Sequence, residues 1–250
     1  MSKSIPVVFV HGVGLDATMW DEVVAKMRDD VACMAIDMAG HGSSTHLAAD
    51  TLSGYVDALE QDIAGRASGP VHLVGFSMGA MVAAAYTLRH PERVTKLVMM
   101  NAVYQRDAVA RDAVLGRLRD AKETGLTVIA DAAIARWFSK EFTIGNPDVI
   151  QAIRDRLISN DLDSYFAAYR VFASGDVELA SCYSQIACPV LAATADGDLN
   201  STPSMSIEIA DSVQDGRAVI WDGLAHGAPI EAPARVAQTL KEFLIEGDTS

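Results

Sequence analysis

Residues 71–81 are Val71-His72-Leu73-Val74-Gly75-Phe76-Ser77-Met78-Gly79-Ala80-Met81, and the rest of the chain is organised around them. The apolar run at 71–74 is typical of a buried strand, and the alanine-rich residues at 80–85 favour a helix. A serine between two glycines at such a strand–helix turn is typical of a nucleophile elbow. The turn places Ser77 at a helix N-terminus, where backbone N–H groups favour negative charge. The segment therefore predicts a nucleophilic serine, against the alternative of an ordinary turn with a capping serine.

The composition is that of an acidic globular protein. The chain has 250 residues, of which 50% are hydrophobic and 21% are charged, and this length suffices for one large α/β domain. The formal net charge of −13 argues against nucleic acid or an anionic membrane as a partner. The sequence also lacks a run of about 18 apolar residues and a signal-peptide pattern at its start. It therefore predicts a cytoplasmic protein and leaves homo-oligomerisation open.

The three cysteines are Cys33, Cys182 and Cys188. Their number is odd and none belongs to a CxxC pair, so neither a disulfide framework nor a zinc site is expected. Cys33 lies in an apolar strand pattern, which predicts a core position. The sequence predicts no metal and no cofactor.

Apolar strand patterns alternate with helical patterns over the first 103 residues. Strands are predicted at 5–10, 31–36, 71–74 and 94–100, separated by turn residues and helical segments. The alternation resumes after residue 184, with strands at 189–194 and 217–221 and a final helix at 233–244. Such alternation predicts a mostly parallel sheet that is covered by helices on both faces.

Between residues 104 and 184 the strand patterns stop. Helical patterns occupy 109–121, 128–138, 147–159 and 162–173, with breaks predicted at Gly125, 145–147 and Gly175. A crossover between two strands normally needs a single helix, so this segment predicts an inserted helical cap. The predicted division is a core domain at 1–103 and 185–250 and a cap at 104–184. The alternative is a set of ordinary crossover helices.

A serine nucleophile needs a base, and six histidines are candidates. His226 lies in a glycine-containing loop directly after the last predicted strand. Functional residues on parallel sheets gather at the carboxyl ends of strands, so we predict that His226 is the base. For the other five histidines a structural role is favoured.

The base needs an acid that holds its tautomer and stabilises the imidazolium. Asp196 and Asp198 both follow the strand predicted at 189–194, and we choose Asp198, with Asp196 as the alternative. An acid after the strand at 94–100 is another arrangement, but that position is Asn101, which carries no charge. The chain order Ser77, Asp198, His226 is the nucleophile–acid–base order of α/β-hydrolases.

Acyl chemistry also requires hydrogen-bond donors for the oxyanion. We expect one donor to be the backbone N–H of Met78, next to the nucleophile, and the other that of Val13, in the loop after the first strand.

Arg136 in the cap is suited to clamp a carboxylate, with a solvated helix face as the alternative. The sequence also predicts an apolar cavity between sheet and cap. Its candidate lining residues are Met19, Trp20, Met38, Met78, Trp137 and Leu224. For each of them a position in the hydrophobic core is the alternative.

Six pieces of the sequence resemble the α/β-hydrolase superfamily and span nearly the whole chain. They are His11-Gly12, Asp37 with Gly40-His41-Gly42-x-Ser44, Gly75-Phe76-Ser77-Met78-Gly79, His90-Pro91-Glu92-Arg93-Val94, Asp198 with Thr202-Pro203, and His226. The resemblance implies an α/β-hydrolase fold, with a mostly parallel central sheet, helices on both faces and an inserted helical cap.

Two further segments resemble the 3-oxoadipate enol-lactonase group, which opens small lactones that carry carboxylates. They are Gly14-Leu15-Asp16 with Met19-Trp20, and Ala135-Arg136-Trp137-Phe138 in the predicted cap. This resemblance implies that Arg136 and Trp137 face the substrate, and Trp20 is a further predicted substrate contact. The chain departs from the lactonases in the loop at 225–229, which leaves the substrate open.

The candidate residues support three hypotheses of function. The first is a cofactor-free serine hydrolase that cleaves a small carboxylic ester or lactone through Ser77, Asp198, His226 and an acyl-enzyme. In the second, the same site cleaves C–C bonds of ring-cleavage products or acts as a cofactor-free haloperoxidase, because the scaffold alone does not choose the chemistry. The third, a small-molecule receptor, is disfavoured by an intact set of serine, acid and histidine.

Overall fold

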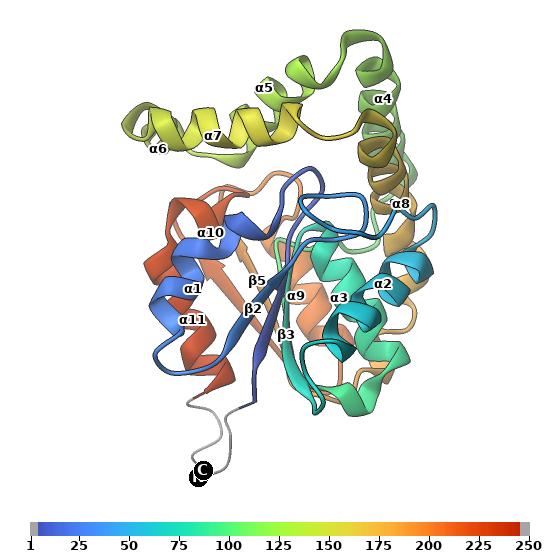
Figure 1. The fold of residues 1–250 in the computed structure, drawn as a ribbon, viewed down its shortest axis with the longest axis vertical. Helices are drawn as coiled ribbons and strands as arrows, with labels where there is room; N and C mark the ends of the chain where they lie inside the picture. Colours follow the sequence, from blue (N-terminus) through green and yellow to red (C-terminus); the bar gives the residue numbers. More distant parts are fainter. Residues whose placement is uncertain (1–4, 246–250) are drawn as a thin grey trace.

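The computed structural model describes residues 5–245, apart from the side chains of residues 120–123 and 178 (Figure 1). The predicted polar tail at 246–250 and the first four residues lie outside the described residues. Six strands form one sheet in the order β2-β1-β3-β4-β5-β6, and every neighbouring pair is parallel, which confirms the predicted α/β architecture. The strands are β1 (Val7–Val10), β2 (Cys33–Ile36), β3 (Val71–Phe76), β4 (Val94–Met100), β5 (Val190–Ala195) and β6 (Gly216–Trp221).

The centre of the sheet is buried on both faces. All residues of β1, β3 and β5 are buried, as a parallel strand between two helical layers requires. The second strand differs from the prediction, because β2 lies at the edge of the sheet and only Ile36 is fully buried in it. Cys33 is accordingly half-buried and not a core residue. An edge strand has a neighbour on one side only, which explains its greater exposure.

Two separate hydrophobic cores lie on the two faces of the sheet. Successive strand side chains point to opposite faces, so Leu73 belongs to one core and Val74 to the other. The first core includes side chains from α2 (Leu52–Ala64), α3 (Met78–Arg89) and α9 (Pro203–Ser212). The second includes those of α1 (Asp21–Met27) and α11 (Pro233–Leu244). Short helices complete the core region: η1 (Ala17–Trp20), η2 (Pro91–Arg93), η3 (Tyr183–Gln185) and α10 (Ala228–Glu231).

Five α-helices, followed by the short helix η3, connect β4 to its neighbour β5. Figure 1 shows α5 to α7 lying across one end of the sheet, with α4 and α8 beside them. We call this segment the cap helices; its assignment to a separate domain stays a prediction. The cap helices are α4 (Ala108–Thr124), α5 (Leu126–Trp137), α6 (Lys140–Gly145), α7 (Pro147–Ile158) and α8 (Leu162–Ala180).

The cap helices differ from the sequence-based expectation in two places. The six-residue helix α6 was not predicted, because it is too short to show a clear hydrophobic period. The predicted break at Gly175 is wrong, since α8 continues through it to Ala180. A Cβ atom at Gly175 would lie 2.5 Å from Cε of Met81, so the glycine permits close packing of α8 on α3. Among residues 5–245, no helix is both long and apolar enough to cross a membrane.

Candidate active site

Ser77 lies between β3 and α3 in a backbone conformation that residues other than glycine rarely adopt. Its φ and ψ angles are 54° and −117°, outside the regions that non-glycine residues favour. The backbone N–H of Ser77 donates a hydrogen bond to the carbonyl oxygen of Met100 at 2.8 Å, which fixes the turn to the end of β4. Strain of this kind persists only where the surrounding structure enforces it, and it is concentrated at functional sites.

The glycines around Ser77 are required by backbone contacts. A Cβ atom at Gly75 would lie 2.3 Å from the carbonyl oxygen of Gly79, and one at Gly79 would lie 2.3 Å from that of His11. At Gly12, a Cβ atom would lie 3.2 Å from Cβ of Ser77. The strand, the helix and the loop after β1 therefore meet at Ser77 with no room for side chains. This packing explains the glycine–serine–glycine spacing of the sequence.

His226 and Asp198 form a buried hydrogen-bonded pair. Nδ1 of His226 lies 2.6 Å from Oδ2 of Asp198, and both residues are at most 3% exposed. The alternative acid, Asp196, is exposed, and its Oδ1 accepts a hydrogen bond from the N–H of Gly223. The geometry therefore joins His226 to Asp198 and not to Asp196.

The Asp198 carboxylate is held in its charged form. Burial by itself would raise the pKa of Asp198, but the neighbouring His226 and several hydrogen bonds to the carboxylate keep that pKa below its usual value. Oδ1 accepts the backbone N–H groups of Asn200 at 2.9 Å and Ser201 at 3.0 Å. Oδ2 also accepts Nδ2 of Asn101 at 2.9 Å. A charged carboxylate at this place can orient the imidazole and stabilise its protonated form.

Asn101 is a site residue whose role the sequence did not predict. It has a φ angle of 49°, is fully buried, and shares its Nδ2 atom between Asp198 and Oγ1 of Thr194. Sequence reasoning considered this position only as a place for an acid. In the structure it is instead a hydrogen-bond donor to Asp198, in the loop after the neighbouring strand β5.

The loop that carries His226 is attached to the cap helices. The N–H of Gly227 donates to the carbonyl oxygen of Trp137 at 2.6 Å, and the Trp137 ring centroid lies 5.9 Å from that of His226. A Cβ atom at Gly227 would lie 2.4 Å from the ring of Phe138. On its other side, the His226 ring lies 5.0 Å from the ring of Phe76. The imidazole is thus held between the sheet and the end of α5.

One cavity of about 240 Å³ connects these residues, and we call it the inner cavity. Ser77 and His226 both line it, together with Gly12 and Val13 from the loop after β1. Met78 is the first residue of α3, and the first N–H groups of a helix have no acceptor within the helix. The oxyanion donors assigned to Val13 and Met78 stay predictions. The cap helices contribute side chains to the same cavity, among them Arg106, Arg117, Arg136, Trp137, Tyr165 and Tyr169.

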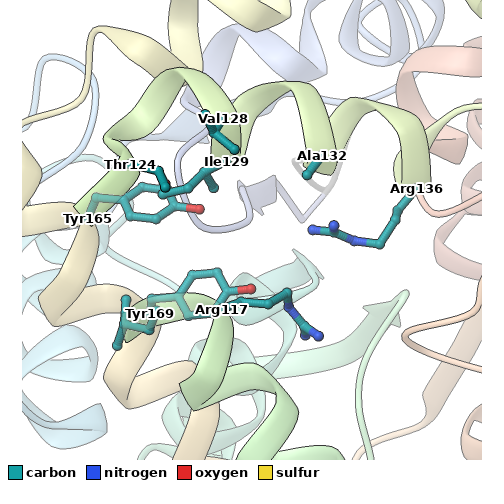
Figure 2. A pocket seen from close by; sticks show the side chains of 9 residues that line it. Arg117, Thr124, Val128, Ile129, Ala132, Arg136, Tyr165 and Tyr169 are labelled. Atoms are coloured by element: carbon teal, nitrogen blue, oxygen red, sulfur yellow. The ribbon is translucent and has the colours of Figure 1, made fainter. Parts of the chain in front are cut away.

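Arg117 of α4 and Arg136 of α5 are two half-buried cations in the inner cavity, and we call them the arginine pair. In the part of the chain that the structure describes, neither forms a salt bridge, and the buried Nε atom of each has no hydrogen-bond partner. Figure 2 shows Arg136 extending from α5 toward Tyr165 and Tyr169, and Arg117 lying beside Tyr169. Burial, and also the proximity of Arg117, lowers the pKa of Arg136, although an arginine stays charged at neutral pH. The pair is therefore suited to bind an anion.

Residues 7–239 match the model of a protein family that is described as the alpha/beta hydrolase family. The chain belongs to the α/β-hydrolase family. The match covers β1 through most of α11, and so includes Ser77, Asp198 and His226. Membership of this family of hydrolases supports an enzymatic role for the protein.

Proteins similar to this chain include hydrolases of several kinds. The (E)-2-((N-methylformamido)methylene)succinate hydrolase of Acinetobacter baylyi is 33% identical over 244 residues, which cover 96% of this chain and 90% of that protein. The 3-oxoadipate enol-lactonase 2 of the same organism is 26% identical over 193 residues, 74% of this chain and 68% of that protein. A structure of a thermophilic esterase from Thermogutta terrifontis with malate bound superimposes with a TM-score of 0.88 at 25% identity, covering 98% of this chain and 90% of that one.

Some of the substrate contacts that were predicted for this α/β-hydrolase line the inner cavity, and others do not. Arg136 and Trp137 line it. Trp20 does not, because its ring is fully buried in the core beneath, with its centroid 5.0 Å from that of Phe9 and 6.4 Å from that of Phe76. We therefore do not retain Trp20 as a substrate contact. The lining also lacks the other predicted cavity residues Met19, Met38, Met78 and Leu224.

Several residues that line the inner cavity were not predicted from the sequence. Arg117 of α4 and Tyr165 and Tyr169 of α8 line it. The spacing of residues in the sequence does not indicate which face of a cap helix lies against the cavity. Arg106 also lines the cavity, but its guanidinium is neutralised by a buried ion pair with Asp176, whose Oδ1 lies 3.0 Å from Nη2. Among the described side chains, no group of three His, Cys, Asp or Glu residues is arranged to hold a metal ion.

His11 is buried and joins two loops through hydrogen bonds to the backbone. Its Nε2 accepts the backbone N–H of Met38 at 2.9 Å, and its Nδ1 lies 2.8 Å from the carbonyl oxygen of Gly12. These partners require a neutral ring with the proton on Nδ1. Burial, together with the neighbouring His41, lowers the pKa of His11 from 6.5 to about 3. The ring joins the loop after β1 to the loop after β2.

This lowered pKa predicts acid sensitivity. Between pH 6.5 and about 3 the unfolded chain binds a proton at His11 that the folded chain does not, so the free energy of unfolding falls as pH falls. We expect a contribution of about 1.4 kcal/mol per pH unit in this range. Urea unfolding at pH 7 and pH 5 measures it. The His11→Gln variant should be less stable at pH 7 but less sensitive to pH, and a sensitivity equal to that of the wild type would contradict the assignment.

Proposed function

We propose that this protein is a cofactor-free serine hydrolase that acts on a small carboxylic ester or lactone bearing a carboxylate. One observation carries the proposal: Ser77 and His226, which is hydrogen-bonded to Asp198, line a single cavity together with the arginine pair. The first set supplies the groups of acyl-transfer chemistry. The second supplies positive charge that has no carboxylate partner among the described residues.

In the proposed reaction, Oγ of Ser77 attacks the carbonyl carbon while Nε2 of His226 takes the serine proton. Asp198 holds the Nδ1–H of His226 and stabilises the imidazolium. The N–H groups of Met78 and Val13 bind the oxyanion of the tetrahedral intermediate. The intermediate collapses to an acyl-enzyme, and the leaving oxygen takes the proton from His226. A water molecule, deprotonated by His226, then attacks the carbonyl carbon of the acyl-enzyme. The second tetrahedral intermediate that forms breaks its bond to Oγ of Ser77, which takes the proton back from His226, and a carboxylic acid is released.

The relatives support a substrate that bears carboxylates. Succinate, 3-oxoadipate and malate, which the names of the three relatives contain, are all dicarboxylates. In this chain the arginine pair would bind the carboxylate that does not react, while the ester or lactone carbonyl lies at Ser77. An amide carbonyl is a second candidate for the scissile group, because the relative that is 33% identical is named for a substrate with an N-methylformamido group.

Matched esters test the proposal. Monoethyl succinate and ethyl butyrate have the same ethyl ester and differ in one end group, a carboxylate against a methyl. We expect the wild type to prefer monoethyl succinate in kcat/KM by about 10- to 100-fold, because a hydrogen bond to a charged group contributes roughly 1.5–3 kcal/mol. Acid release in a pH-stat measures both rates, and the N-methyl amide of succinic acid tests the second candidate.

Charge removal at the arginine pair should weaken this preference. Arg117→Gln and Arg136→Gln are each expected to raise KM for monoethyl succinate about tenfold or more, with little change for ethyl butyrate. Arg119→Gln is the matched control, since Arg119 lies on α4 but is exposed and does not line the cavity. Equal losses on both esters, or no preference in the wild type, would contradict the proposed substrate class.

A further inference from the structure

A second cavity lies beside the inner cavity, and we call it the outer cavity. It has a volume of about 160 Å³ and shares four lining residues with the inner one: Arg117, Arg136, Tyr165 and Tyr169. The arginine pair and the two tyrosines thus stand at the boundary between the two spaces. The remaining lining, which belongs to the outer cavity alone, consists of Leu118, Thr124, Val128, Ile129 and Ala132.

The two sides of this boundary differ in chemistry. The inner side contains Ser77 and His226, whereas the outer side is walled by aliphatic side chains of α4 and α5 (Figure 2). The rings of Tyr165 and Tyr169 are stacked at the boundary, with their centroids 5.6 Å apart. Val128, which lines the outer cavity, is 54% exposed, so this cavity reaches solvent at Val128. An apolar group placed there would be removed from water by these walls without entering the catalytic space.

We infer that the outer cavity binds an apolar substituent of the substrate, attached to the carbon atom that carries the free carboxylate. This inference rests on the proposed function, because it takes the arginine pair as the carboxylate site. A carboxylate held at the boundary leaves its α-carbon with one branch directed toward Ser77 and one toward the outer cavity. The substrate is then a half-ester or lactone of a dicarboxylic acid that is substituted with an alkyl or aryl group beside the free carboxylate.

Binding of 2-alkylsuccinates tests the inference without any turnover. Succinate and its 2-methyl, 2-propyl and 2-pentyl derivatives are titrated calorimetrically into the wild-type protein. We expect Kd to fall about fourfold for each added methylene until the cavity is filled, since burial of each methylene is favourable by a similar amount. An affinity that does not depend on the alkyl group would overturn the inference.

Filling the cavity supplies the matched comparison. Ala132 is exposed on α5 and lines the outer cavity only, so Ala132→Trp should fold, which thermal unfolding checks, and should abolish the gain from the alkyl group. Thr127→Trp is the control, because Thr127 is exposed on the same helix and lines neither cavity. It should keep the wild-type dependence on chain length. A gain from the alkyl group that survives in Ala132→Trp would contradict the inference.

Turnover of the corresponding monoethyl esters, with the alkyl group beside the free carboxylate, separates this inference from the proposed function. If none is hydrolysed while affinity still rises with chain length, the proposed reaction fails and the subsite stands. If monoethyl succinate is hydrolysed but neither Kd nor kcat/KM depends on the alkyl group, the subsite fails alone. Should Ala132→Trp lower kcat/KM by the same factor for every ester, the outer cavity is an entrance and not a subsite.

Discussion

Replacement of Ser77 by alanine is expected to lower kcat for monoethyl succinate by about 10⁴-fold or more. Without Oγ no acyl-enzyme forms, and only the donors that bind the oxyanion and the groups that bind the substrate remain. The backbone should be unchanged, because alanine and serine tolerate a φ angle of 54° equally poorly. The measurement is kcat from acid release, together with thermal unfolding to show that the fold is retained.

A second serine provides the control for this prediction. Ser204 is exposed at the start of α9 and does not line the inner cavity, so Ser204→Ala should keep the wild-type rate. Covalent labelling gives an independent readout: a phosphonate ester should add one adduct to the wild type and none to Ser77→Ala. Undiminished turnover by Ser77→Ala would falsify the role of Ser77 as nucleophile.

The change Asp198→Asn is expected to lower kcat by about 10⁴-fold at pH 7. The amide that replaces the carboxylate carries no charge to stabilise an imidazolium, and its NH₂ group can favour the wrong tautomer of His226. Asn101 adds to the effect, since its Nδ2 already donates to Oδ2 of Asp198 and so requires an acceptor there. The loss should appear in kcat more than in KM, because the charge acts chiefly when His226 is protonated during the reaction.

Asp196→Asn is the matched control, two residues earlier in the same loop. Asp196 is exposed and accepts only the N–H of Gly223 among the hydrogen bonds described, so its replacement should change kcat by less than about threefold. A larger loss from Asp196→Asn than from Asp198→Asn would reverse the assignment of the acid.

The features that could be predicted from sequence are local or periodic. The strand, turn and helix around Ser77 follow one another along the chain, and the alternation of strands and helices fixes a parallel sheet. In such a sheet the ends of β5 and β6 meet at the same edge, which is why Asp198 and His226 could be chosen as neighbours of Ser77.

The features that could not be predicted depend on contacts between distant segments. Whether Gly175 breaks a helix or packs against its neighbour depends on Met81, which belongs to α3. The periodicity of a helix shows which side is buried but not what buries it, so Trp20 could be placed in the cavity when it belongs to the core. Arg117 carries no signal of its own, because its role depends on how α4 stands against α5 and α8.

The attachment of Trp137 and Phe138 to the loop of His226 has a consequence for how specificity changes among such enzymes. A chimera that received residues 104–184 from a relative would also receive a new support for His226, the proposed general base. The incoming segment would have to supply a carbonyl oxygen that accepts the N–H of Gly227 and an aromatic ring that packs against Gly227. Without them, the chimera would lose turnover as well as its original selectivity. Single substitutions in α4, in α8 and in the part of α5 before Trp137 leave that junction intact, and they are the safer route by which such an enzyme acquires a new substrate.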